Sequence, residues 1–176
     1  MQNRDEMYDF IDAEIENLRK EFGKFPVIRA ESEDTPERFE QGRQMALDGW
    51  RGDAGVLPRD EDGRYLLIQH ENSKGEWGVP GGGHKSGETM AETARRECEE
   101  ETGHVCSLTG VIAVRIKAIR HETDPEQTLP MLTVWFEGST ESGTLASSDD
   151  EVVAIGWFDE LPENVFHILD EYVSAE

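Results

Sequence analysis

Residues 77–104 read WGVPGGGHKSGETMAETARRECEEETGH, and this stretch decides the fold of the chain. A glycine-rich loop, residues 77–83, leads into residues 89–102, which predict a helix that ends at Gly103. The glycines at 81–83 allow the backbone to approach a phosphate or a metal directly, although a glycine run can also be only a tight turn. The glycine run alone therefore does not distinguish a ligand-binding loop from a turn, and the helix that follows it has to be considered.

Three glutamates of that helix share one face. Glu97, Glu100 and Glu101 are three and four positions apart, so their carboxylates project together. Like charges at this spacing destabilise an isolated helix by about 0.2–0.5 kcal/mol per pair. In a glutamate-rich chain the triplet alone favours a solvated face. The alternative is a hard divalent cation, because magnesium and manganese prefer oxygen ligands and usually lie between carboxylates and substrate phosphates.

The spacing of the whole stretch resembles the box of the Nudix family. That box is Gly, five residues, Glu, seven residues, then Arg-Glu-apolar-any-Glu-Glu-any-Gly-apolar. The closing apolar position departs from it, since the chain has His104 there. The seven Gly, Glu and Arg positions would match by accident with a probability of roughly 10⁻⁴ or less, which is far safer than most short motifs. The matching residues are Gly82, Glu88, Arg96, Glu97, Cys98, Glu100, Glu101 and Gly103.

The resemblance implies an α/β fold, namely a Nudix-type α/β/α sandwich with a mixed β-sheet. It also implies that Arg96 pairs with Glu88 and so fixes the helix against the loop. A Mg²⁺ or Mn²⁺ ion would have as ligands the Gly81 carbonyl and the carboxylates of Glu97, Glu100 and Glu101.

A further acidic ligand often precedes a later strand in this family. Here Asp149, Asp150 and Glu151 precede residues 152–158, and position favours Glu151. A solvated acidic turn is the alternative. The general base is either a box glutamate or a residue on a later loop.

The function implied by the resemblance is metal-dependent hydrolysis of a diphosphate linkage. The substrate would be a small nucleoside-diphosphate-linked or related molecule, attacked by water at phosphorus. One rival hypothesis is a Nudix-fold domain that binds a nucleotide or metabolite without turning it over. Another is an acidic cation-binding protein whose box is accidental. Sugar nucleotides, nucleoside triphosphates and diphosphate cofactors all stay open as substrates.

Short β-like runs surround the box. Residues 50–57 and 65–70 flank a turn at 59–63 and predict a hairpin. Because strands and helices interleave, we expect a mixed sheet between helical layers. The remaining elements expected are strands at 108–120, 131–137 and 152–158 and a last helix at 163–173.

The first 48 residues predict a helical extension to a Nudix domain of residues 49–176. Thr35 and Pro36 begin a second helix that ends near Gly49, and residues 30–34 form a polar connection before it. The extension is either a dimerisation arm, which would make a homodimer, or a lid, or a helix pair packed on the core; the last is favoured. The first helix has an apolar stripe of Tyr8, Ile11, Ile15, Leu18 and Phe22.

The charge of the chain limits its partners. Asp and Glu number 39 against 17 Lys and Arg, for a formal net charge of −22. This argues against binding of a nucleic-acid duplex or an anionic membrane through a basic surface. The pattern resembles the cytoplasmic proteins of salt-loving archaea, since molar salt shortens the screening length to about 3 Å. An ordinary acidic bacterial protein is the alternative. Cys98 and Cys106 make no disulfide framework, so we expect a reduced cytoplasmic setting.

A few residues outside the box have two interpretations. In an extended strand Arg115 and Lys117 share a face, where they either meet substrate phosphates or pair with surface acids. His84 and His121 are expected to be ordinary surface histidines, and Cys98 a buried inert thiol. The aromatic residues of the β runs, which could stack a nucleobase but more often lie in a core, are Trp50, Trp77, Trp135, Phe136 and Trp157.

Overall fold

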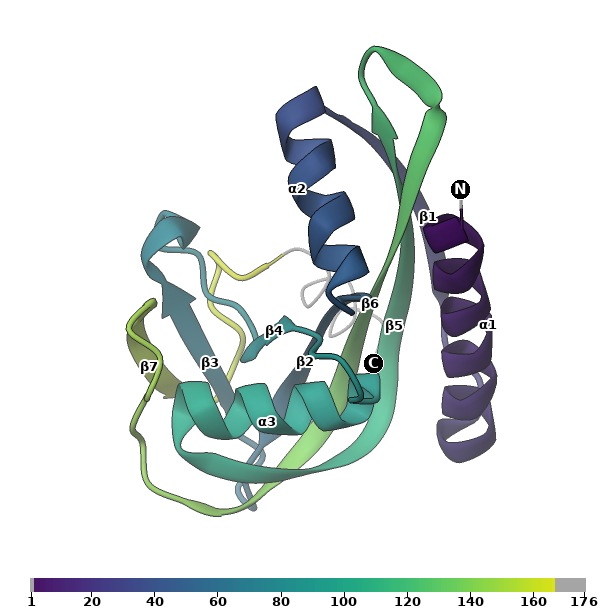
Figure 1. Ribbon diagram of the computed structural model, residues 1–176. Coiled ribbons are helices and arrows are strands. Elements are labelled where there is room, and N and C mark those ends of the chain that lie inside the picture. Colours follow the sequence, from purple (N-terminus) through teal and green to yellow (C-terminus); the bar gives the residue numbers. More distant parts are fainter. Residues whose placement is uncertain (1, 167–176) are drawn as a thin grey trace.

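The computed structural model of the protein describes residues 2–166. A mixed sheet of seven strands and three α-helices make up this part of the chain (Figure 1). The α/β fold expected from the sequence is confirmed. The elements are α1 (Gln2–Phe22), β1 (Val27–Asp34), α2 (Pro36–Leu47), β2 (Gly52–Arg59), β3 (Tyr65–His70), a 3₁₀ turn η1 (Glu71–Ser73), β4 (Gly81–Gly83), α3 (Met90–Thr102), β5 (His104–His121), β6 (Asp124–Gly143) and β7 (Val152–Phe158).

The sheet is opened near its middle by the glycine-rich loop. Its strand order is β1-β5-β6-β2-β3-β7, with β4 paired to β2. Strands β2 and β3 pair only where Arg59 lies opposite Tyr65. Further along, β4 runs against β2 and Gly78 bridges to Ile68 of β3. The loop is therefore inserted between two strands of the sheet, which lets groups from both strands surround it (Figure 1).

Two apolar clusters cover the two faces of the sheet. Successive strand residues point to opposite faces, and accordingly Val134 and Phe136 of β6 pack in one cluster and Trp135 in the other. The first cluster includes Met90, Ala94 and Cys98 of α3. On the opposite face, Phe158 at the end of β7 and the segment that follows it supply the cover, the residues of that segment being Leu161, Val165 and Phe166.

The N-terminal segment packs on this core, which was the favoured alternative. Ile11, Ile15 and Leu18 of α1 belong to the same cluster as α3. Phe39 and Ala46 of α2 pack in a third cluster with residues of β5 and β6. The division of the chain into an extension of residues 1–48 and a domain of residues 49–176 stays a prediction.

The prediction that residues 30–34 are a polar connection is wrong, because they belong to β1. This strand runs parallel to β5 with Val27 opposite Val114 and Asp34 opposite His121. It lies at the edge of the sheet, where one side of the strand faces solvent and polar residues are tolerated. For the same reason its sequence lacks the apolar alternation by which strands are recognised.

The other differences concern the ends of elements. β5 and β6 extend well beyond 108–120 and 131–137, since they pair with each other along nearly their whole length. His121, expected in a loop, is the last residue of β5. Of the helix expected at 163–173, residues 163–166 form a turn and a bridge in which Val165 meets Trp77, and the rest lies outside the described residues. None of the helices within residues 2–166 has the length and apolarity needed to cross a membrane.

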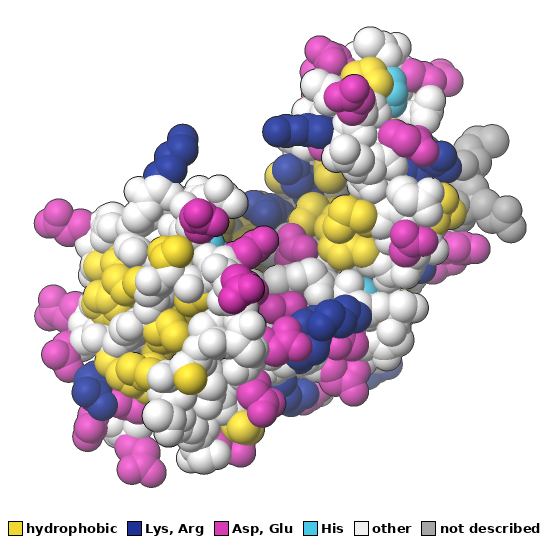
Figure 2. Space-filling model, turned by 60° about the vertical axis from the view of Figure 1, so that its left-hand side comes forward, with side chains coloured by type: hydrophobic (Ala, Val, Ile, Leu, Met, Phe, Trp, Pro, Cys, Tyr) yellow, Lys and Arg dark blue, Asp and Glu magenta, His cyan; other side chains and the backbone are white. Residues whose placement is uncertain are grey.

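On the face shown in Figure 2, acidic side chains are scattered rather than gathered on one patch. If the acid excess is an adaptation to salt, the melting temperature should rise as KCl is raised from low to molar concentration, because the salt screens this self-repulsion. Thermal unfolding followed by circular dichroism checks it, with glycerol as a control for general solute effects. A melting temperature that is flat or falls would contradict the adaptation.

Candidate active site

The glycine strand β4 presents backbone groups to α3. The Val56 N–H donates to the Pro80 carbonyl at 3.0 Å, which sets the register of the antiparallel pair of β2 and β4. Residues of such a pair alternate between hydrogen-bonded and non-hydrogen-bonded positions, so Gly81 and Gly83 direct their N–H and C=O groups away from β2. Two of these groups contact α3: the Gly81 N–H donates to Glu101, and the Gly83 carbonyl accepts from Arg96.

Helix α3 is closed at both ends by local signals. Thr89 is its N-cap and forms a capping box with Glu92. Gly103 ends the helix in the left-handed conformation, with φ of 72°. Two of the box glutamates, Glu97 and Glu101, are buried on the side of the helix that faces β4. The helix predicted at 89–102 and its end at Gly103 are thus confirmed.

Glu101 is the most deeply buried carboxylate of the box, with 1% of its surface exposed. Its Oε2 accepts the Gly81 N–H at 2.7 Å, and its Oε1 lies 3.1 Å from Nε2 of His70. The hydrogen bond that His70 donates to Glu101 raises the pKa of His70, while partial burial acts in the opposite direction. Glu101 therefore joins the loop, the helix and the end of β3.

Arg96 is the centre of the charge network. Its Nε and Nη2 donate to the two oxygens of Glu88 at 2.7 and 3.0 Å, which confirms the expected pair. Nη2 also donates to the Gly83 carbonyl at 2.9 Å. Nη1 donates to both Glu97 and Glu100. The guanidinium thus ties the loop to three carboxylates.

Glu97 fits against the backbone of Gly82. A Cβ built on Gly82 would lie 2.7 Å from the Glu97 carboxyl carbon, so a side chain at that position would displace the carboxylate. Burial raises the pKa of Glu97, and Arg96 partly offsets this effect. Glu100 is half exposed, with Lys85 Nζ 3.7 Å from its Oε1.

The chemistry of this donor set fits a hard divalent cation. Three carboxylates gather around Arg96, the carboxylate of Glu101 lies against the Gly81 N–H, and the groups of this set that could bind a metal are all oxygens. Among residues 2–166 no three acidic, histidine or cysteine side chains already converge on one point. Arg96 Nη1 and the Gly81 N–H occupy carboxylate oxygens of Glu97, Glu100 and Glu101 in this structure.

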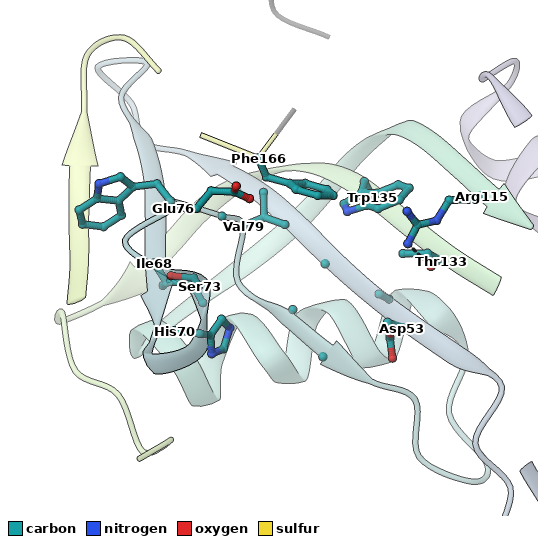
Figure 3. Close-up of a pocket in the computed structure, with 16 residues that line it drawn as sticks. Asp53, Ile68, His70, Ser73, Glu76, Val79, Arg115, Thr133, Trp135 and Phe166 are labelled. Atoms are coloured by element: carbon teal, nitrogen blue, oxygen red, sulfur yellow. Dashed lines mark hydrogen bonds between the residues drawn. The ribbon is translucent and has the colours of Figure 1, made fainter. Parts of the chain in front are cut away.

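A cavity of about 330 Å³ lies on the face of the sheet opposite α3 (Figure 3). His70 and Ser73 lie at one end, and Arg115, Thr133 and Asp53 at the other. The wall between them is formed by the backbone of Gly81 and Gly82 and by apolar side chains, namely Ile68, Trp77, Val79, Trp135 and Phe166.

The Arg115 end of the cavity is polar and desolvated. The guanidinium lies 5.0 Å from the centre of the Trp135 ring, a cation–π contact. Its Nε is buried and has no hydrogen-bond partner among the described residues. Burial raises the pKa of Asp53, whereas Trp50, which donates to it, lowers that pKa. This end therefore offers both a donor and an acceptor to a ligand.

Comparison with known proteins agrees with the box and the fold. A NUDIX domain family model matches residues 49–164. The chain belongs to the Nudix family. An RNA pyrophosphohydrolase of Erythrobacter litoralis is 39% identical over 79 residues, 44% of this chain and 48% of the relative. A putative 8-oxo-dGTP diphosphatase of Mycobacterium tuberculosis is 42% identical over 66 residues, 34% and 30% of the two chains. The matched stretches thus span about half the length of these relatives or less.

Solved structures show the same Nudix fold. The crystal structure of a NUDIX hydrolase from Nitrosomonas europaea superposes with a TM-score of 0.53 at 17% identity, covering 72% of this chain and 68% of the other. The family match contains strands β2 to β7 and the helix carrying the box, whereas α1, β1 and α2 lie before residue 49 and outside it.

The Glu88–Arg96 pair of the Nudix box predicts a loss of stability in acid. The hydrogen bond from Arg96 lowers the pKa of Glu88 from 4.5 to about 2. A depressed pKa stabilises the fold above the unfolded value, and this stabilisation is lost as pH falls from 4.5 towards 2. We expect Glu88→Gln to be less stable than the wild type at neutral pH, with the difference shrinking across that window. Urea unfolding at stepped pH checks this, and the exposed Glu99→Gln is the control. Parallel pH curves for the wild type and Glu88→Gln would contradict it.

Two of the residues expected around the Nudix box lie further out. Glu151 is exposed, but its carbonyl accepts the Glu71 N–H at 2.8 Å, which places it next to His70. Lys117 is half-buried on the face of Arg115, yet it is not among the described residues that line the cavity. Their site roles stay predictions.

Other residues of the site were missed or misjudged. His70 reaches Glu101 only because β3 runs beside the inserted loop, and no spacing in the sequence indicates this. The prediction that His84 is a surface histidine is wrong, since it is 6% exposed and packs on Phe10. Cys98 is fully buried, as expected.

Proposed function

We propose that the protein hydrolyses a diphosphate linkage in a nucleoside-diphosphate-linked or related small molecule. The reaction would depend on a divalent metal and proceed by water attack at phosphorus. One observation carries this proposal: all the carboxylates of the Nudix box are present, and the buried Glu101 contacts Gly81 and His70, which line a cavity with aromatic walls. A domain that only binds nucleotides has no need of this concentration of buried negative charge, which is costly without a cation.

The proposed metal is Mg²⁺ or Mn²⁺, in keeping with the general use of divalent metals by Nudix hydrolases. Bound metal would neutralise charge on the diphosphate oxygens and lower the pKa of the attacking water. The proposed ligands are the Gly81 carbonyl and the carboxylates of Glu97, Glu100, Glu101 and Glu151.

The protein's own groups would position the reactants. Arg96 and Glu88 hold α3 against β4, which keeps the Gly81 carbonyl next to the box carboxylates. The walls of Trp135 and Phe166 exclude water from one side of the substrate and offer a stacking surface for a base or another flat group. A carboxylate of the box, or one of the loop that ends at Glu151, would accept the proton of the attacking water.

Arg115 is proposed to bind a phosphate of the substrate, and its mutation tests this. Arg115→Ala should raise KM by about tenfold or more and lower kcat less, because a contact made equally in substrate and transition state affects binding alone. Lys117→Ala should change KM less than Arg115→Ala does, since Lys117 does not line the cavity within the described residues. Steady-state kinetics of both variants checks this; wild-type kinetics for Arg115→Ala would show that the arginine only packs on Trp135.

A panel of diphosphate compounds, each assayed with Mg²⁺ and with Mn²⁺, tests the proposed function. It should contain sugar nucleotides, nucleoside triphosphates including 8-oxo-dGTP, diphosphate cofactors and an RNA with a 5′ diphosphate linkage. We expect at least one compound to be split into two products that both end in phosphate. Titration calorimetry on the same panel tests the alternative. Heat of binding for a compound that is not hydrolysed would indicate a domain that binds without turnover.

A further inference from the structure

A carboxylate of α1 lies at the first turn of the box helix. Glu14 is 7% exposed, and its Oε1 accepts the N–H of Met90 at 2.9 Å. Met90 is the first residue of α3 and is fully buried. The bond joins residues 76 positions apart, and it connects the part of the chain before the family match to the helix that carries the box glutamates.

Glu14 completes the capping of α3. The first four N–H groups of a helix have no partner within it. The Thr89 hydroxyl accepts from the Glu92 N–H, which leaves the Met90 N–H to Glu14. A carboxylate at this end also interacts favourably with the helix dipole. The capping of the box helix is therefore shared between its own sequence and α1.

The position of Glu14 is not explained by packing alone. Its neighbours in the sequence stripe, Ile11, Ile15 and Leu18, bury apolar side chains in the core. A carboxylate there loses its hydration, and burial accordingly raises the pKa of Glu14. An apolar side chain would fill the site at lower cost, so the carboxylate is explained by the hydrogen bond that it accepts.

A second contact links α1 to the loop before α3. The Phe10 ring packs edge-on against His84, with ring centres 5.4 Å apart. His84 Nε2 lies 2.7 Å from the Glu88 carbonyl and donates to it. The Glu88 side chain in turn binds Arg96. Through these contacts α1 touches both the loop and the helix of the site.

We propose that α1 positions the box helix, with Glu14 holding its first turn so that Glu97 and Glu101 stay aligned with β4. Glu14 is a positioning residue, because its contact is to the Met90 backbone and lies away from the cavity. The catalytic consequence rests on the function proposed above, whereas the effects on α3 and on metal binding do not.

Three variants of α1 test the proposal. Glu14→Leu removes the acceptor and fills the buried position, whereas Glu14→Gln keeps an oxygen that accepts the Met90 N–H. Asp12→Leu makes the same change as Glu14→Leu at an exposed position of α1. The measurements are amide hydrogen exchange at Met90 by NMR, Mn²⁺ affinity by calorimetry, and kcat and KM on the best panel substrate.

In Glu14→Leu, exchange at Met90 should accelerate by about tenfold to a hundredfold, the loss expected for a hydrogen bond to a charged group. Mn²⁺ affinity should fall by about tenfold, and kcat should fall more than KM rises. In Glu14→Gln the exchange rate, the Mn²⁺ affinity and the kinetic constants should lie close to those of the wild type. In Asp12→Leu all of them should equal the wild-type values.

Two results would overturn the proposal. One is exchange at Met90 in Glu14→Leu equal to that in Asp12→Leu. The other is faster exchange with unchanged Mn²⁺ affinity, which would reduce Glu14 to a capping residue without effect on the site. If the wild type hydrolyses nothing in the panel, the proposed function fails, but exchange and Mn²⁺ affinity still decide the role of Glu14.

Discussion

Replacing Glu101 by glutamine should lower kcat for diphosphate hydrolysis by more than about a hundredfold. The free energy of unfolding should stay within about 1 kcal/mol of the wild type. Both expectations follow from where the carboxylate lies. The amide oxygen of glutamine can still accept the Gly81 N–H, so the link between loop and helix survives. The negative charge that a divalent cation needs is lost.

The matched control for Glu101→Gln is Glu99→Gln, which makes the same change on the exposed side of α3. Steady-state kinetics at several Mg²⁺ concentrations and urea unfolding of both variants provide the comparison. Near-normal turnover in Glu101→Gln would show that Glu101 is not a ligand of the catalytic metal.

Replacing Arg96 by methionine should impair both folding and activity. The side chain is 18% exposed and is the shared partner of Glu88, Glu97 and Glu100. Without it these carboxylates repel one another, and we expect the free energy of unfolding to fall by about 2–3 kcal/mol. Activity should fall as well, because the Gly83 carbonyl is released and β4 is no longer held to α3.

Arg95→Met is the control for Arg96→Met, since Arg95 is the exposed neighbour on the same helix. Its unfolding free energy should change by less than about 0.5 kcal/mol. Arg96→Lys should recover only part of the loss, because one ammonium cannot reproduce the planar fork that reaches several oxygens. If Arg96→Met and Arg95→Met had the same free energy of unfolding, the ion pairs of Arg96 would not contribute to the stability of the fold.

The sequence predicted those parts of the site that depend on near neighbours. The helix predicted from Thr89 and ended by Gly103 is α3, and the spacing of Glu97 and Glu101 places both on one face. Such signals act over one or two helical turns and can be read without the fold. The Arg96–Glu88 pair was found because the family box implies it.

Other parts arise only when distant segments meet. β1 was missed because its polar residues are stabilised by pairing with β5, more than eighty positions away. His70 comes to Glu101 through the opening between β2 and β3. Glu14 looks like any other acidic residue of α1 until the Met90 N–H is seen beside it. In each case the deciding interaction is tertiary, and local propensity contains no information about it.

Hydrolysis in ¹⁸O-labelled water tests the central claim most directly. The best substrate of the panel is turned over with Mg²⁺, and its products are analysed by mass spectrometry. The account predicts one ¹⁸O atom per turnover in a phosphate group of one product, no turnover after chelation of the metal, and turnover reduced by more than about a hundredfold in Glu101→Gln. Undiminished turnover in the presence of a chelator, or products without ¹⁸O in phosphate, would contradict it.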